Sequence, residues 1–275
     1  MKKRFLSAAV FLPAIILLSI AGGYFFLLLI AFTSFMAAYE CNKILERRNA
    51  ASMPLLSGVF STILVIATYI LLSIPSYTNV NVIAVTMSIT SVTSMTWMLF
   101  SLKSTPKFIH NIAGLIAPAL YTGGILTMAV MLREDKNGLA LIFYLITLTS
   151  AVDTGAYLIG KLTGKTPFFP QISPSKTWEG SFGGMICAVT ASVLFGITAS
   201  ETNVLHISLP HSVLVGILIG FSGQIGDLYE SSLKRKSQIK DSGTLIPGHG
   251  GVLDRIDSVI FNIPVIYYSV QWLIE

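Results

Sequence analysis

The sequence has little charge and almost no cysteine. Of its 275 residues, 11% are charged and 53% are hydrophobic, and the mean hydropathy is +0.74. That hydropathy is far above the value of an ordinary soluble domain. The two cysteines, Cys41 and Cys187, lie far apart and fit no metal-binding spacing. We therefore expect neither a disulfide framework nor a cysteine metal site.

Apolar runs fill most of the chain. Several approach or exceed the roughly 20 residues that cross a hydrocarbon core, and none shows the alternation of a transmembrane β-strand. The loops are short, which leaves no room for a separate soluble domain. We predict an all-α, polytopic transmembrane helical bundle of about nine spans. They are residues 5–21, 23–39, 55–74, 81–100, 111–132, 138–160, 180–199, 211–229 and 258–274.

The N-terminal run follows Met1-Lys2-Lys3-Arg4, an arrangement that can also mark a signal peptide. A second apolar run follows almost at once, which favours two retained helices. The first two spans have only about 17 residues each, close to the lower limit for a crossing. Joined by Ala21-Gly22-Gly23, they could instead form a helical hairpin that does not cross fully.

Lysine and arginine are distributed unequally between the two sides of this threading. With the N-terminus inside, 16 of the 18 basic residues fall on inside segments, and only Arg133 and Lys136 fall outside. The positive-inside rule then predicts a cytoplasmic N-terminus and an outer C-terminus in the cell (inner) membrane. The basic face would also attract anionic lipids.

Acidic residues separate the two halves of the chain. Residues 1–132 contain only Glu40 and Glu46, whereas residues 150–257 contain seven acids on or near the predicted cytoplasmic side. We therefore expect scaffold helices in residues 1–132 and a catalytic region with cytoplasmic loops in residues 133–275. We find no internal repeat, which weakens the case for a transporter built from inverted halves.

The stretch Ser231–Asp257 holds eight charged residues and one histidine in 27 positions. Around His249, three glycines leave backbone N–H groups open to an anion. A tight re-entrant bend is the simpler alternative, but nearby basic residues supply countercharge for a polyphosphate. These basic residues are Lys234, Arg235, Lys240 and Arg255. His249 could bind phosphate, donate a proton or shape the loop.

Aspartates lie near both ends of this stretch. Asp227 is roughly 10 Å along a helix from Lys234, a depth at which a carboxylate is normally functional. An Asp–Lys pair closing a helix end is the alternative. Asp254 and Asp257 share one face at the start of the last span, where a helix dipole also favours acids. Oxygen ligands of this kind suit Mg²⁺.

Two upstream segments complete the candidate site. Asp153 lies eight residues before Lys161 and has either a buried structural role or a role in the site. In the loop Pro167–Gly180, Ser173, Lys176 and Thr177 can donate to phosphate. Metal, basic groups and a membrane location together predict phosphoryl or nucleotidyl transfer between a cytosolic nucleotide and a lipid.

The spacing of these residues resembles the phosphatidate cytidylyltransferases (CDP-diacylglycerol synthases). The resemblance lies in Ser231-x-Leu-Lys-Arg235, Lys240-Asp241 and Ile246-Pro-x-His249-Gly-Gly-Val-x-Asp254-Arg-Ile-Asp257, and upstream in Ser173-Pro-x-Lys-Thr-x-Glu-Gly180 and Gly226-Asp227-Leu-x-Glu. It implies phospholipid synthesis, in which CTP and phosphatidic acid give CDP-diacylglycerol and pyrophosphate with Mg²⁺. It also implies a second, monovalent cation (K⁺) and a homodimer in the bilayer, and no nucleic-acid partner.

The expected site residues fall into three groups. The catalytic group is Asp227, Asp254, Lys234, Arg235 and His249. The substrate-binding group is Ser173, Lys176, Thr177, Lys240, Gly250, Gly251 and Arg255. The metal group is Asp227, Asp254, Asp257 and Asp153. Three alternatives remain: a CDP-alcohol phosphotransferase, whose aspartate motif is missing here, a CTP-dependent lipid or polyprenol kinase, and an ion-coupled transporter.

Overall fold

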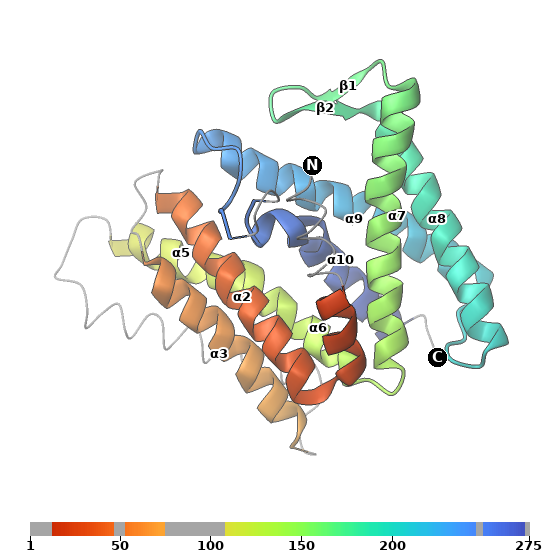
Figure 1. The fold of residues 1–275 in the computed structure, drawn as a ribbon, viewed down its shortest axis with the longest axis horizontal. Coiled ribbons are helices and arrows are strands. Elements are labelled where there is room, and N and C mark those ends of the chain that lie inside the picture. The colour runs from red at the N-terminus through yellow and green to blue at the C-terminus, as the bar shows by residue number, and fades with distance from the viewer. Residues whose placement is uncertain (1–12, 47–52, 75–107, 246–249, 273–275) are drawn as a thin grey trace. The chain divides into compact units, whose positions relative to one another are not determined.

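The computed structural model describes residues 13–46, 53–74, 108–245 and 250–272, and side chains from residue 114 in the third range (Figure 1). These residues are mainly helical, as predicted. The departure is one short antiparallel hairpin, formed by β1 (Pro167–Phe169) and β2 (Ser173–Thr177). It lies in the loop Pro167–Gly180, for which the sequence predicts donors to phosphate but no strand.

The chain divides into two compact units. The first comprises Met1–Glu134 and Lys236–Arg255, and the second comprises Asp135–Arg235 and Ile256–Glu275. The chain passes from the first unit to the second between Glu134 and Asp135, and again between Arg255 and Ile256. Most of the charged stretch belongs with the N-terminal helices and not with the C-terminal region.

Helices α2 and α3 pack together in the first unit, and three further segments contact them. The elements are α2 (Gly23–Glu46), α3 (Pro54–Leu72), α5 (Phe108–Ala119), the π-helical turn η1 (Leu120–Gly124) and α6 (Ile125–Arg133). Pro118 near the end of α5 removes one helical N–H donor, which explains the irregular turn that follows. Buried hydroxyls join these elements, since Ser61 bonds both Ser34 (2.6 Å) and Thr122 (2.9 Å).

Two glycines turn the chain before α2. Residues 13–21 are helical, and Gly22 and Gly23 have φ of 65° and 48°, a conformation that favours glycine. Arg133 caps the preceding helix by donating to the carbonyl oxygens of Ser19 (2.8 Å) and Ile20 (3.3 Å). Arg133, one of the two basic residues predicted on the outer side of the membrane, thus has a structural role.

The second unit contains most or all of four long helices. They are α7 (Gly138–Thr163), α8 (Trp178–Glu201), α9 (Leu209–Lys236) and α10 (Leu253–Trp272). Leu253–Arg255 at the start of α10 belong to the first unit. Two G-x-x-x-G patterns, Gly180–Gly184 and Gly216–Gly220, allow the helices to pack closely. A Cβ at Gly184 would lie 2.8 Å from the Val152 carbonyl oxygen on α7, and one at Gly216 would lie 2.5 Å from the Cα of Val189 on α8. Asn262 on α10 accepts from Ser222 on α9 (2.5 Å) and donates to Thr149 on α7 (2.9 Å).

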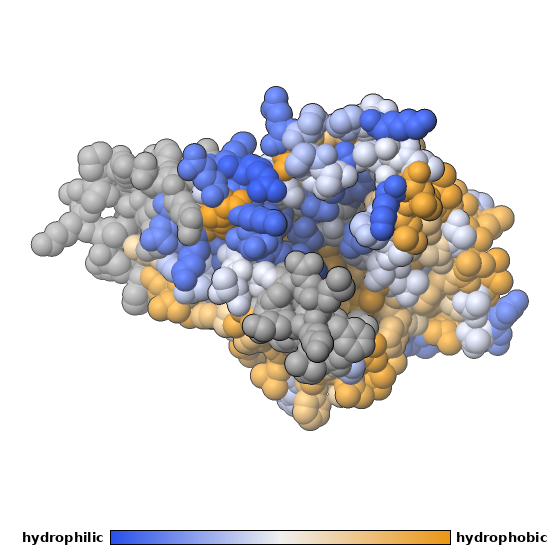
Figure 2. Space-filling view, turned by 45° about the horizontal axis from the view of Figure 1, so that its top comes forward, coloured by the Kyte–Doolittle hydropathy of each residue, from blue (hydrophilic) through white to orange (hydrophobic). Residues whose placement is uncertain are grey.

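Six helical segments of the described chain are long and apolar enough to cross a membrane. They are Gly23–Glu46, Pro54–Leu72, Gly114–Arg133, Gly138–Thr163, Trp178–Glu201 and Leu209–Lys236. Each matches a predicted span. Helix α2 is long enough to cross the membrane by itself, without the segment that precedes it. Of the other predictions, 81–100 and the first part of 5–21 (residues 5–12) lie outside the described residues, and α10 is not among the six. Exposed apolar side chains are widespread on the drawn face (orange in Figure 2), as lipid-facing helices require.

Candidate active site

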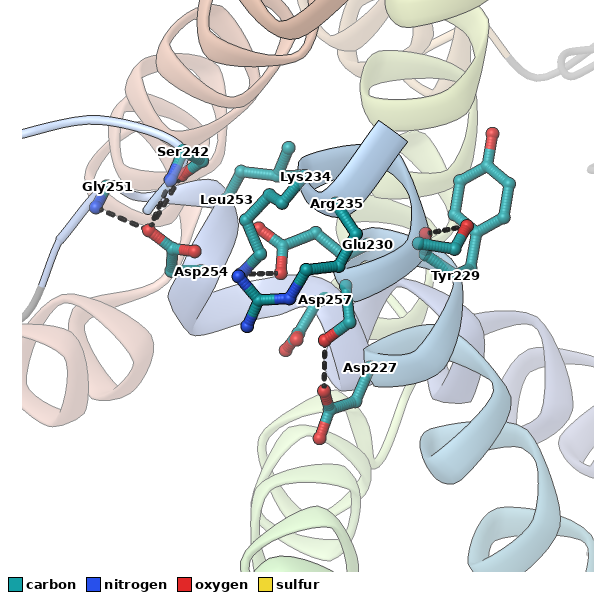
Figure 3. A network of polar contacts seen from close by, with 12 residues as sticks. Asp227, Tyr229, Glu230, Lys234, Arg235, Ser242, Gly251, Leu253, Asp254 and Asp257 are labelled. Atoms are coloured by element: carbon teal, nitrogen blue, oxygen red, sulfur yellow. Dashed lines mark hydrogen bonds and ion pairs between the residues drawn. The ribbon is translucent and has the colours of Figure 1, made fainter. Parts of the chain in front are cut away.

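Lys176 and Asp227 form an ion pair in the second unit. The Lys176 Nζ lies 2.7 Å from Asp227 Oδ2, and both side chains are partly exposed. Asp227 also accepts a 3.3 Å hydrogen bond from the hydroxyl of Ser231 (Figure 3). A predicted phosphate-binding lysine and a predicted metal ligand are therefore adjacent. In the sequence they lie 51 positions apart, separated by α8, the loop after α8 and most of α9.

The β1–β2 hairpin places Lys176 beside α9. Thr177 pairs with Pro167 across the hairpin and then caps α8 by accepting from the N–H of Gly180 (3.2 Å). The guanidinium of Arg235 at the end of α9 donates to the carbonyl oxygen of Ile172 in the hairpin turn (3.2 Å). Lys176 thus lies between the Thr177 cap of α8 and the hydrogen-bonded carbonyl oxygen of Ile172. The hydrogen bond from Arg235 holds the hairpin against α9.

Lys234 has a different acidic partner. It pairs with Glu230 one helical turn earlier on α9, and the Glu230 side chain is fully buried (Figure 3). An Asp227–Lys234 pair is the alternative to a metal-binding role of Asp227 that the sequence leaves open. In the structure Asp227 pairs with Lys176, and Lys234 compensates the charge of Glu230.

Asp257 of the second unit lies within electrostatic range of two other aspartates. The Asp257 carboxylate interacts with those of Asp227 and Asp153, and with Lys234. Gly226 allows α9 and α10 to approach at this level, because a Cβ there would lie 2.5 Å from the Asp257 carbonyl oxygen. Mutual repulsion among carboxylates is relieved by a bound cation, so the arrangement favours one electrostatically.

The donor set fits Mg²⁺ when substrate oxygens complete it. Within the described ranges, no three Asp, Glu, His or Cys side chains are close enough to hold a metal without other ligands. Mg²⁺ in nucleotide sites usually takes one or two carboxylates together with phosphates and water. Asp227 and Asp257 would supply such carboxylates.

Asp254 in the first unit is held by its own loop. Its Oδ2 accepts from the N–H of Ser242 (2.8 Å), the hydroxyl of Ser242 (2.9 Å) and the N–H of Gly251 (2.8 Å) (Figure 3). Gly250 has φ of 89°, and a Cβ there would lie 2.6 Å from Asp254 Oδ2. The N–H of Gly251, expected to approach an anionic substrate, is donated here to a carboxylate of the protein.

Glu40 is a functional candidate that the sequence analysis missed. This α2 residue is 4% exposed and accepts from the N–H of Val252 (3.1 Å), the N–H of Leu253 (2.8 Å) and the hydroxyl of Ser242 (2.9 Å). It had been grouped with the scaffold. A signal was present, because a lone acid in an apolar span is normally functional.

The expected site residues are divided between the two units. Lys240, Gly250, Gly251, Asp254 and Arg255 belong to the first, and Asp153, Ser173, Lys176, Thr177, Asp227, Lys234, Arg235 and Asp257 belong to the second. Asp254 and Asp257 both lie in the beginning of α10, as predicted. The expected meeting of Asp227 with Asp254 stays a prediction. His249 lies outside the described residues.

The six long apolar helices indicate a membrane protein, and the family it matches makes it a membrane-embedded transferase. The chain belongs to the cytidylyltransferase family, which it matches over residues 2–273. It is 32% identical over 270 residues to the phosphatidate cytidylyltransferase of Bacillus subtilis, covering 98% of this chain and 97% of that protein.

Two further relatives have the same name. The phosphatidate cytidylyltransferase of Staphylococcus saprophyticus is 31% identical over 268 residues, which cover 97% of both chains. That of Haemophilus influenzae is 40% identical over 136 residues, which cover 50% of this chain and 47% of the relative. The family assignment therefore extends over the whole chain, including the N-terminal helices for which the sequence analysis had found only hydrophobic character.

Proposed function

We propose that the protein is a membrane nucleotidyltransferase that converts CTP and phosphatidic acid to CDP-diacylglycerol and pyrophosphate. The observation that carries this proposal is the end-to-end similarity to relatives named for phosphatidate cytidylyltransfer. The Lys176–Asp227 pair supports it, because it joins a phosphate-binding cation to a metal-binding carboxylate.

The reaction needs charge neutralisation more than proton transfer. An oxygen of the lipid phosphate attacks the α-phosphorus of CTP, a new P–O bond forms, and the bond to the β-phosphate breaks with release of pyrophosphate. The attacking phosphate monoester is already anionic, so no general base is required. Bound Mg²⁺ would polarise the phosphates, held by Asp227 and Asp257. Lys176 exchanges its Asp227 partner for a phosphate oxygen when the nucleotide binds.

The active site faces the cytoplasm in this proposal. Support comes from the 16 of 18 basic residues that the threading places on that side. Contacts within the first unit agree with the threading, since Ser237 of one predicted cytoplasmic segment donates to the carbonyl oxygen of Ile44 in another (2.9 Å). Arg133 likewise contacts Ser19 and Ile20 near the predicted outer ends of two spans. A bound K⁺ and a homodimer belong to the same proposal.

A product analysis tests the proposal. Purified protein is incubated with phosphatidic acid, Mg²⁺ and CTP that carries one label in the cytosine and another in the γ-phosphate. The proposal expects cytosine label in the lipid and γ-label in pyrophosphate. Label from the γ-phosphate in the lipid, with release of CDP, would instead identify a lipid kinase.

A further inference from the structure

The reaction proposed above leaves one buried carboxylate without a role. Glu40 is almost fully enclosed, and all three of its hydrogen bonds given above come from donors. A buried carboxylate is costly unless such donors satisfy it. An ionised carboxylate only accepts hydrogen bonds, so this environment is built for the charged form of Glu40.

The hydroxyl of Ser242 connects Glu40 to Asp254. Its oxygen lies 2.9 Å from Glu40 Oε2 and 2.9 Å from Asp254 Oδ2. A hydroxyl carries a single proton, so it bridges the two carboxylates and cannot donate fully to both at once. A change in Glu40 therefore alters the hydrogen bonding of Asp254 through one intervening residue.

Two glycines let the loop close around Glu40. A Cβ built on Gly243 would collide with the Glu40 carboxylate, and one built on Gly251 would collide with both Glu40 and Ser242. The backbone approaches this closely only because those side chains are missing. The loop is therefore shaped to fit a carboxylate at this point.

Glu40 also caps the start of α10. It accepts the N–H groups of Val252 and Leu253, donors that a helix leaves unsatisfied at its first turn. A negative charge there is further stabilised by the helix dipole. The first turn of α10 carries Asp254, so Glu40 fixes both the backbone and a hydrogen-bond partner of that residue.

We propose that Glu40 is a positioning residue for nucleotidyl transfer, which orients the Asp254 carboxylate through Ser242 and through the start of α10. This inference rests on the proposed function and on the sequence prediction that Asp254 is a metal ligand. Groups that hydrogen-bond a metal ligand typically change metal affinity or activity by about 10- to 100-fold when they are mutated.

The variant Glu40→Gln tests the charge with little change in shape. We expect kcat to fall by roughly 10- to 100-fold and the Mg²⁺ concentration for half-maximal rate to rise. A role in folding alone would lower the amount of active protein without moving the Mg²⁺ requirement. Glu46→Gln is the matched control, because Glu46 ends the same helix and is exposed. It should retain the wild-type kcat and Mg²⁺ requirement.

Ser242→Ala tests separately the hydrogen-bonded connection between Glu40 and Asp254. If Glu40→Gln does not fold, this second variant decides whether the positioning role holds. It should raise the Mg²⁺ requirement in the same direction. In the double variant, the loss should be close to that of the more damaging single variant, because both changes interrupt one path.

Each contrary result has its own meaning. If the wild type is active, and both single variants keep kcat and Mg²⁺ requirement within about twofold, the role of Glu40 is overturned. Losses that multiply in the double variant would overturn the path through Ser242. An inactive wild type under all conditions would instead overturn the proposed function itself.

Discussion

The two units hold their aspartates in different ways. In the first, Asp254 Oδ2 is bound by two backbone N–H groups and one hydroxyl. In the second, Asp227 is bound by the ammonium group of Lys176 on a hairpin. Donors built into the loop backbone fix an orientation, whereas a partly exposed ion pair is weak and can exchange partners. The comparison suggests one carboxylate that is fixed before substrate arrives and one that is available to respond to it.

The largest effects should come from removing either carboxylate charge. We expect Asp227→Asn and Asp254→Asn each to lower kcat by about a thousandfold or more, because a metal ligand supplies several kcal/mol of transition-state stabilisation. Initial rates with CTP and phosphatidic acid measure this. Near-wild-type turnover in either variant would remove that residue from the metal site.

The same two variants should differ in stability. Asp254→Asn replaces the charged acceptor of three hydrogen bonds by a neutral one, so it should cost about 1–3 kcal/mol and lower the thermal midpoint in detergent. Asp227→Asn should leave that midpoint nearly unchanged. Equal midpoints for both variants would contradict the contrast between a fixed and an exchangeable carboxylate.

Lys176→Ala should have an intermediate effect on activity. With Lys176 removed, Asp227 keeps its charge but a phosphate oxygen loses a partner, so we expect the KM for CTP to rise by about tenfold. The dependence of rate on CTP concentration at saturating Mg²⁺ provides the measurement. An unchanged KM for CTP would assign Lys176 to structure alone.

Gly250→Ala should disturb the fixed carboxylate without removing it. The φ of 89° costs a non-glycine residue about 1–2 kcal/mol, and the new methyl group would press on Asp254 Oδ2. We expect a lower thermal midpoint together with a lower kcat. Gly216→Ala packs against α8 in the second unit and provides a comparison at a glycine with no left-handed backbone. Its midpoint should fall without any change in Mg²⁺ requirement.

Arg133→Ala should give the smallest effect. It removes a cap from the helix over residues 13–21, which is worth about 0.3–1 kcal/mol. Lys136→Ala is the matched control, since Lys136 is exposed in the adjoining turn. The thermal midpoint should fall slightly for Arg133→Ala alone, and kcat should not change in either variant. A large loss of activity in Arg133→Ala would mean that a change at this cap also disturbs the loop that holds Asp254.

Much of this architecture follows from sequence because hydrophobic length is a local property. Six predicted spans have matching helices, and the glycine pairs near Gly184 and Gly216 pack as their spacing predicts. The partner of Lys234 was also available locally, because Glu230 lies at the favourable i, i+4 spacing. The alternative considered from the sequence pairs Lys234 with Asp227, which lies seven positions earlier.

Other features depend on contacts between distant parts of the chain. The sequence marks Lys176 and Asp227 as candidates, but only the hairpin and the packing of α8 and α9 make them neighbours. Glu40 was missed because none of its partners lies within 200 positions of it. Composition alone predicts scaffold for residues 1–132, and the hydrogen bonds of one buried side chain in that region support the role proposed for Glu40.

The long separation between Glu40 and its partners has a consequence for biosynthesis. Its hydrogen bonds span 202 to 213 positions, so α2 is made well before residues 242–253 emerge from the ribosome. At about 5–20 residues per second, the carboxylate waits on the order of 10–40 seconds for its donors. During that interval water must solvate it, which favours keeping this end of α2 at the aqueous boundary until the last helix has been inserted. The first unit therefore cannot complete these hydrogen bonds until residues 242–253 have been made.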